Sequence, residues 1–207
     1  INRGIGIKKA VELYEAAENS IGVSEGHEMA EMQLQDYLRQ YELLKKQITR
    51  VESKIEDILG EIPGAKEMLT VPGVGKMTVA GIYAECGDLG DYQHPKQIIS
   101  LAGLNLMEHS SGKHKGETTI TKRGRPRLRS LLYRVSLPLV RHNSEFKQIH
   151  KYYTTRSQNP LAKQQSLIAI CCKLIRVLFT LGTQQVEYYG EKMLNDIERP
   201  EDYQQAA

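Results

Sequence analysis

Apolar residues recur three or four positions apart along much of the first third of the chain. This spacing is the heptad seam of a coiled coil and predicts a long helix over residues 23–62. Two uses of the seam stay open: self-association, which we favour, or an intramolecular hairpin with an amphipathic helix near residues 8–19. Pro63 and Gly64 should end the long helix. The seam consists of Leu34, Leu38, Tyr41, Leu44, Ile48, Val51, Ile55, Ile58 and Ile62.

A glycine-containing turn follows between two helical patterns. Residues 69–80 read Leu-Thr-Val-Pro-Gly-Val-Gly-Lys-Met-Thr-Val-Ala, and a helix should continue to about Cys86. This pattern is typical of a helix-hairpin-helix, in which glycines let backbone amides approach a phosphate at a helix N-terminus. We therefore predict that Gly73, Gly75 and Lys76 contact DNA. The alternative is a plain corner between two helices, in which the glycines serve only the turn.

The remaining pattern predicts a helical domain with one short β element. Residues 117–121 are β-prone and predict a short hairpin or loop. A helix should begin at Pro126, with apolar residues on one stripe and Arg127, Arg134 and Arg141 on another, and Pro138 should kink or end it early. Residues 161–181 are apolar on nearly every face, as in a buried helix, and the tail after Gly190 should be frayed. The fold class is mainly α.

Composition adds limits to this picture. Apolar residues make up 40% of the 207 residues, which suits a folded core, and no apolar run approaches the ~20 residues that a membrane span needs. Cys171 and Cys172 lie next to each other in an apolar helix and resemble small buried hydrophobes. The third cysteine makes the number odd, which favours a reducing compartment. We expect a cytoplasmic protein without a membrane partner.

Positive charge is concentrated in one segment. Residues 1–70 carry nine Lys or Arg against thirteen Asp or Glu, whereas residues 113–144 carry nine against one. A basic block in an otherwise balanced chain is typical of a polyanion site, although such runs can also be solvated faces. The candidate DNA- or RNA-binding residues in the block are Lys113, Lys115, Lys122, Arg123, Arg125, Arg127, Arg129 and Arg134.

A serine loop precedes these cations. In Ser110-Ser111-Gly112, a hydroxyl lies close in sequence to guanidinium groups that could stabilise charge on an attacked phosphate. A Ser-Gly pair is also an ordinary turn. No histidine spacing, carboxylate pair or phosphate-binding loop indicates a metal site, so we predict none in this chain.

Several segments together resemble one family, the transposases of the insertion-sequence 110 (116/110/902) type. The resemblance runs from about residue 5 to residue 190, and its parts are specific only in combination. They are the heptad helix, residues 69–80, Ala84-Glu-Cys-Gly-Asp88, Leu101-Ala-Gly-Leu104, Ser111-Gly112, Lys122-Arg-Gly124, Leu128-Arg129 and the helix at residues 167–178.

The resemblance implies a bacterial recombinase that mobilises an insertion sequence by cutting and rejoining DNA strands. It implies a preceding RuvC-like domain with metal-binding acids and Mg²⁺, a nucleophilic serine at Ser111, and a structured noncoding guide RNA as partner. Residues 1–22 would end that domain or link to it, 23–62 would form the coiled coil, 63–190 the transposase domain and 191–207 a polar tail. We expect this chain alone to be inactive and to form homo-oligomers through the coiled coil.

Two other classes of protein fit the same residues. One is a non-enzymatic DNA-binding and dimerisation module that uses the helix-hairpin-helix. The other is a structural assembly domain. A nucleophilic serine should be accessible and surrounded by arginines, whereas a turn serine should cap a backbone group. Absence of salt-dependent nucleic-acid binding would indicate the structural domain.

Overall fold

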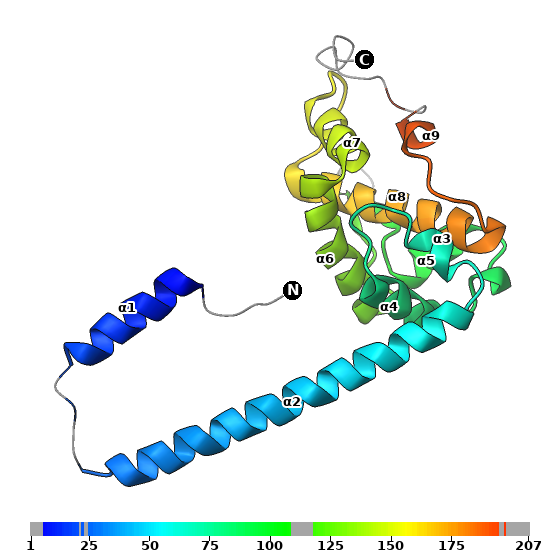
Figure 1. The fold of residues 1–207 in the computed structure, drawn as a ribbon. Coiled ribbons are helices and arrows are strands. Elements are labelled where there is room, and N and C mark those ends of the chain that lie inside the picture. Colours follow the sequence, from blue (N-terminus) through cyan, green and yellow to red (C-terminus); the bar gives the residue numbers. More distant parts are fainter. Residues whose placement is uncertain (1–5, 21, 23–24, 109–117, 195–196, 198–207) are drawn as a thin grey trace. The chain divides into compact units, whose positions relative to one another are not determined.

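The computed structural model describes residues 6–20, 22, 25–108, 118–194 and 197. The described chain is mostly helical, with one small two-stranded sheet, as the sequence predicts (Figure 1). It divides into two compact units, residues 1–50 and 51–207.

The first unit contains helix α1 (Ile7–Glu18) and most of helix α2 (His27–Glu61). The long helix is thus confirmed, and it ends two residues before Pro63. No residue of α1 is buried. Apolar residues of α2 such as Leu34, Leu44 and Ile48 are each more than half exposed. Packing within this unit therefore leaves the apolar face of α2 uncovered, and its self-association stays a prediction.

The C-terminal end of α2 belongs to the second unit and uses the same face differently. Leu59 is buried, while Ile55 and Ile62 pack partly buried against the core, and Ile58 on the edge of that face stays 56% exposed. The apolar face of α2 is therefore exposed in the first unit and packs into the core of the second unit. Its last two turns are part of a domain core.

The second unit is a helical body arranged around α8. This helix contacts α3, α5, α6, α7 and the short 3₁₀ helix η1, while α4 packs on α6 and α9 on α7. The elements are α3 (Ala65–Met68), α4 (Lys76–Cys86), η1 (Leu89–Asp91), α5 (Pro95–Leu101), β1 (Leu106–Glu108), β2 (Thr118–Ile120), α6 (Pro126–His142), α7 (Ser144–Thr155), α8 (Lys163–Gln184) and α9 (Gly190–Leu194).

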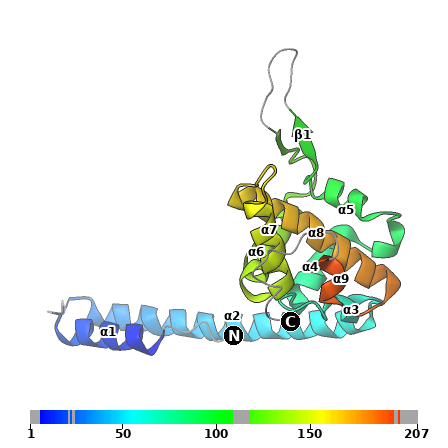
Figure 2. The same cartoon turned by 90° about the horizontal axis from the view of Figure 1, so that it is seen from above.

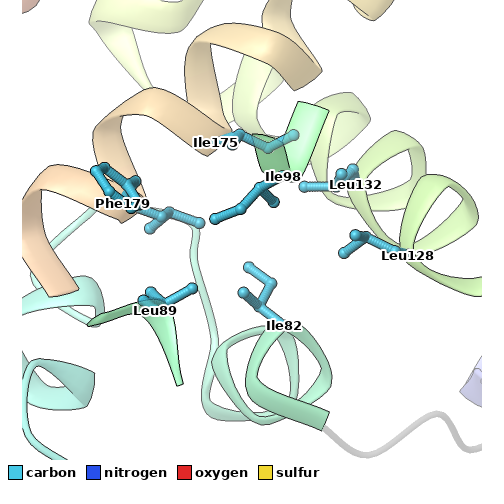
Figure 3. A pocket seen from close by; sticks show the side chains of 8 residues that line it. Ile82, Leu89, Ile98, Leu128, Leu132, Ile175 and Phe179 are labelled. Atoms are coloured by element: carbon cyan, nitrogen blue, oxygen red, sulfur yellow. The ribbon is translucent and has the colours of Figure 1, made fainter. Parts of the chain in front are cut away.

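Apolar side chains from five of these elements meet at the centre of the body. Figure 3 shows them converging on one small gap, and none of them carries a polar group. This region therefore stabilises the body by apolar burial and offers no group for catalysis or for ligand recognition. The lining residues are Ile82, Leu89, Ile98, Leu128, Leu132, Ile175, Leu178 and Phe179.

Helix α6 passes through Pro138 and ends only at His142, so the expected early end is wrong. Proline removes one backbone hydrogen bond of the helix, at a cost of about 3 kcal/mol. Burial of the next residue, Leu139, offsets this cost, because its side chain is fully buried in the core. The Asn143 backbone N–H also donates to the Leu139 carbonyl at 2.9 Å, which completes the last turn.

The two strands form a short antiparallel hairpin, with Leu106 opposite Ile120 and Glu108 opposite Thr118. Figure 2 shows β1 leading away from the helices of this unit. Residues 109–117 connect the two strands.

The C-terminal elements differ in how well the sequence predicts them. The buried helix expected at residues 161–181 is confirmed as α8, and by length and composition alone α8 could also cross a membrane. We expected a frayed tail after Gly190, and this is wrong for its first residues. Gly190–Leu194 form α9, and the Met193 and Leu194 side chains are buried, so apolar contacts hold this segment on the body. Residues 195–196 and 198–207 lie outside the described residues.

Candidate nucleic-acid interface

Helix α6 separates apolar and basic side chains onto different faces. Leu128, Leu132 and Leu139 are almost completely buried. Arg127, Arg134 and Arg141 follow one another at seven-residue intervals and are exposed. Among the described residues, none of these three guanidinium groups has a hydrogen-bond or ion-pair partner. Burial of the apolar face therefore fixes a row of three free cations on the surface.

Two other arginines of the basic block have partners inside the chain. Arg125 donates from Nη1 to the Glu85 carbonyl oxygen at 2.6 Å and lies 3.9 Å from the Glu85 carboxylate. Arg129 donates from Nη1 to the carbonyl oxygens of Ala102 at 2.9 Å and Lys122 at 3.4 Å. The sequence did not predict these structural roles. Contacts of Arg125 and Arg129 with DNA stay a prediction.

Lys122 and Arg123 occupy the segment between β2 and α6, and their side chains are exposed. This segment lies backbone to backbone against residues 101–104, because the Lys122 N–H donates to the Gly103 carbonyl at 3.0 Å and the Arg125 N–H to the Leu101 carbonyl at 2.7 Å. At Gly103, with φ 67°, a Cβ would lie 2.8 Å from the Arg123 carbonyl oxygen. Only glycine allows this close approach.

The Pro-Gly turn joins α3 to α4 as the sequence predicts. Gly73 has a φ of 96°, and a Cβ there would lie 3.0 Å from the Leu139 side chain, so the turn packs on α6. Buried Asn143 holds the turn from the other side by donating from Nδ2 to the Pro72 carbonyl at 3.0 Å. Gly75 is open, with nothing within 4 Å of its Cβ position. Its contact with a phosphate stays a prediction.

Lys76, the third residue that we predict to contact DNA at this turn, has a partner in the chain. Its Nζ lies 2.8 Å from the Glu56 carboxylate of α2, and both side chains are about half exposed. An exposed pair of this kind contributes little to stability. Lys76 can therefore exchange Glu56 for a phosphate at small cost.

Ser111, Lys113 and Lys115 lie outside the described residues, as does Ser110. Their roles stay predictions. The hairpin strands β1 and β2 flank this segment on both sides.

Other nucleophilic groups of the body are held in their neutral form. Burial raises the pKa of the Cys171 thiol to about 12, and that of Cys86 to about 11. Neither thiol therefore supplies a thiolate at neutral pH. Among the described residues, no group of three or more His, Cys, Asp or Glu side chains could hold a metal ion.

The sequence did not predict the open groove of about 430 Å³ between α4 and α6. The residues on α4 lie in or beside Ala84-Glu-Cys-Gly-Asp88, one of the segments that carry the family resemblance, but their sequence gave no sign of a groove. The groove is lined by Gly81, Ala84, Glu85, Pro126, Arg127, Ser130, Leu131 and Arg134.

Both a protein-family comparison and individual relatives relate this chain to proteins named as transposases or gene-inverting proteins. Residues 65–152 match the description of the transposase IS116/IS110/IS902 family. This match covers α3 to most of α7 and so includes the groove and the row of arginines on α6.

Individual relatives are similar to this chain over about two thirds of its length. The transposase for insertion sequence element IS1111A of Coxiella burnetii is 26% identical over 137 residues, which are 66% of this chain and 38% of that protein. The pilin gene-inverting protein of Moraxella bovis is 29% identical over 144 residues, 66% of this chain and 44% of that protein. The transposase for insertion sequence element IS1328 of Yersinia enterocolitica is 28% identical over 151 residues, 70% and 43% respectively. The matched region thus spans less than half of each relative.

Proposed function

We propose that this chain, whose residues 65–152 match the transposase IS116/IS110/IS902 family, is the DNA-binding and recombination part of such an enzyme. The complete protein would mobilise an insertion sequence by cutting and rejoining DNA strands. A pilin gene-inverting protein among the relatives supports recombination as the reaction, since inversion of a DNA segment requires strands to be cut and rejoined.

The row Arg127, Arg134 and Arg141 on α6 carries this proposal. Seven residues of an α-helix rise about 10 Å, so the three guanidinium groups form a line of positive charge along the helix. Arginine binds phosphate oxygens through two parallel hydrogen bonds, and neutralising each phosphate releases counterions. A family member with three such unpaired groups on one face is equipped to hold a nucleic-acid backbone.

The turn before α4 supports a second backbone contact. Gly75 leaves the N-terminus of α4 open, and the partial positive charge of a helix N-terminus favours a phosphate. Lys76 would leave Glu56 to join that contact. If this turn alone bound DNA, the chain would be the alternative non-enzymatic helix-hairpin-helix module, and the relatives named as transposases weigh against that reading.

For the chemistry, we propose Ser111 as nucleophile. Its Oγ would form a bond to phosphorus while the bond to the departing strand oxygen breaks, and the serine proton would be lost to a base. Thiols do not compete at neutral pH, because burial raises the pKa values of Cys86 and Cys171. We propose that the Mg²⁺ implied by the family resemblance is bound by a preceding domain of the complete protein.

We propose different partners for the two units of the chain. DNA, and a structured noncoding RNA, would bind to the cations of the second unit. A second copy of the chain would cover the apolar face of α2, where Leu34, Leu44 and Ile48 are each more than half exposed. Self-association of α2 would bring two such interfaces into one assembly, as recombination between two DNA sites requires.

Salt-dependent binding tests the DNA-binding proposal. We expect the affinity of the chain for labelled duplex DNA, measured by fluorescence anisotropy, to fall linearly with salt on logarithmic axes. Replacing both Arg127 and Arg134 with alanine should reduce that slope by about two units, since each phosphate contact contributes about 0.9. Replacing Lys45 and Lys46 on α2, which removes the same charge elsewhere, should leave the slope unchanged. An unaltered slope in the arginine variant would contradict the proposal.

A further inference from the structure

The groove between α4 and α6 has two chemically different walls. On the α6 side it is lined by Arg127, Ser130 and Arg134, which offer cations and a hydroxyl. On the α4 side it is lined by Gly81, Ala84 and Glu85. Gly81 and Ala84 have little or no side chain, so on this side the Glu85 carboxylate is the polar side-chain group, and it can accept hydrogen bonds.

The helices α4 and α6 pack closely beside the groove, at Gly81 and Leu131. The Leu131 side chain of α6 lies against Gly81, where a Cβ would be 2.7 Å from Leu131 Cδ2. A side chain at residue 81 would have to displace the end of the Leu131 side chain from this position. Leu131 and Pro126 of α6 add apolar surface to the lining of the groove.

The Glu85 wall is held in place by Arg125. That guanidinium binds both the Glu85 carbonyl oxygen and, at 3.9 Å, its carboxylate. The Glu85 side chain is only 21% exposed, so its orientation is restrained. A carboxylate in this position repels a phosphate and accepts hydrogen bonds from amino groups.

We infer that this groove holds one unpaired nucleotide of a nucleic-acid strand, with its phosphate on the α6 wall and its base edge towards Glu85. The inference rests on the proposed function and specifies one site within it. Arg127 and Arg134 would bind phosphate oxygens, while the apolar surface and a guanidinium plane would contact the base face, as arginine does with unstacked bases.

The size and charge of the groove select this occupant over others. Its volume of about 430 Å³ lies within the range of small-ligand pockets, which suits a nucleotide and is too small for a duplex. Two unpaired arginines on one wall favour an anion. An amino group on the base, present in cytosine and adenine and absent from thymine, would donate to the Glu85 carboxylate.

Filling the groove without changing its charge tests this site. Ala84→Leu, which fills the groove without adding an aromatic ring, should weaken binding of a labelled twelve-nucleotide oligo-dC about tenfold, which corresponds to about 1.4 kcal/mol and is typical of one lost base contact. Ser130→Leu narrows the groove from the opposite wall and should act in the same direction. Ser100→Leu, at another exposed position on α5, should leave the affinity unchanged. Thermal unfolding of each variant would verify that it folds.

Base preference tests the orientation. The unaltered chain should bind oligo-dC more tightly than oligo-dT, and Glu85→Gln should reduce that preference. Equal affinities for the two oligonucleotides would overturn the orientation. Unchanged oligo-dC binding in both folded groove variants would overturn the site itself.

The experiments distinguish an error in the proposed nucleotide site from an error in the proposed function. If the Arg127 and Arg134 double variant lowers the salt slope of duplex binding while the groove variants bind oligo-dC normally, the α6 face binds DNA and the groove holds no nucleotide. If none of these variants changes any binding, both the function and the site are wrong.

Discussion

Arg127 and Arg129 are two positions apart on α6, yet their surroundings differ. Arg127 is exposed and has no partner among the described residues. Arg129 is half-buried and donates to two backbone carbonyls, one of them on the fully buried residue Ala102. Arg127 is therefore free to bind a ligand. Arg129 instead links α6 to the residues that follow α5 and β2.

Replacing Arg129 with alanine should therefore destabilise the second unit. A hydrogen bond from a charged donor contributes about 1.5 to 3 kcal/mol, and its loss leaves the Ala102 carbonyl without this partner. The free energy of unfolding, measured with denaturant, should fall by about that amount. Arg127→Ala should change it by no more than about 0.5 kcal/mol. Equal effects of the two substitutions would contradict these different roles.

Ser111→Ala tests the proposed nucleophile in the complete protein. Loss of the hydroxyl should abolish strand exchange and the protein-DNA adduct that survives denaturation, while DNA binding stays nearly unchanged. Gel electrophoresis after denaturation would detect the adduct.

Ser110→Ala is the matched control and should retain the adduct. If Ser110→Ala loses it and Ser111→Ala keeps it, the nucleophile is the neighbouring residue. If both variants keep it, neither serine forms the adduct.

Among the elements, α2 is the one whose apolar face is only partly covered. From Leu34 to Val51 this face is more than half exposed, whereas Leu59 near the C-terminal end is buried in the core of the second unit. The heptad pattern alone does not distinguish these two parts, because both follow the same spacing. The packing of the second unit makes that distinction.

Substitutions in the exposed part should separate self-association from folding. Leu44→Asp together with Ile48→Asp would bury two unpaired charges in a coiled coil and should shift the molar mass measured by light scattering towards that of a monomer. Lys46→Gln with Ser53→Asp makes the net charge more negative by the same amount on the opposite side of α2 and should leave the mass unchanged. A monomer at high concentration before any substitution would contradict self-association.

At the scale of the whole molecule, binding and catalysis should be separable. The matched region spans 38% to 44% of three relatives, and we propose that the metal-binding groups lie in the part of the complete protein that precedes it. We therefore expect this chain with Mg²⁺ to bind plasmid DNA in mobility-shift assays without cutting it. The complete protein, including the preceding domain that we propose, should cut the same DNA. Nicking by the 207-residue chain alone would show that the catalytic groups lie within it.

The sequence by itself determined the elements and the faces of the helices. The extent of α2, the Pro-Gly turn before α4, the start of α6 at Pro126 and the buried character of α8 all follow from residue spacing, because helix periodicity and turn chemistry are local properties. The same spacing separated the arginine row of α6 from its buried leucines. Pro138 is the exception, since the packing of α6 kept the helix intact there.

Only the tertiary structure decided which cations have partners and where a groove forms. Arg125 meets Glu85 across 40 positions, and Arg129 meets Ala102 across 27. The groove likewise joins Gly81 and Ala84 of α4 to Arg127 and Arg134 of α6. Such contacts depend on how helices distant in sequence pack together, and that packing is set by the shared apolar core rather than by the pattern within either helix.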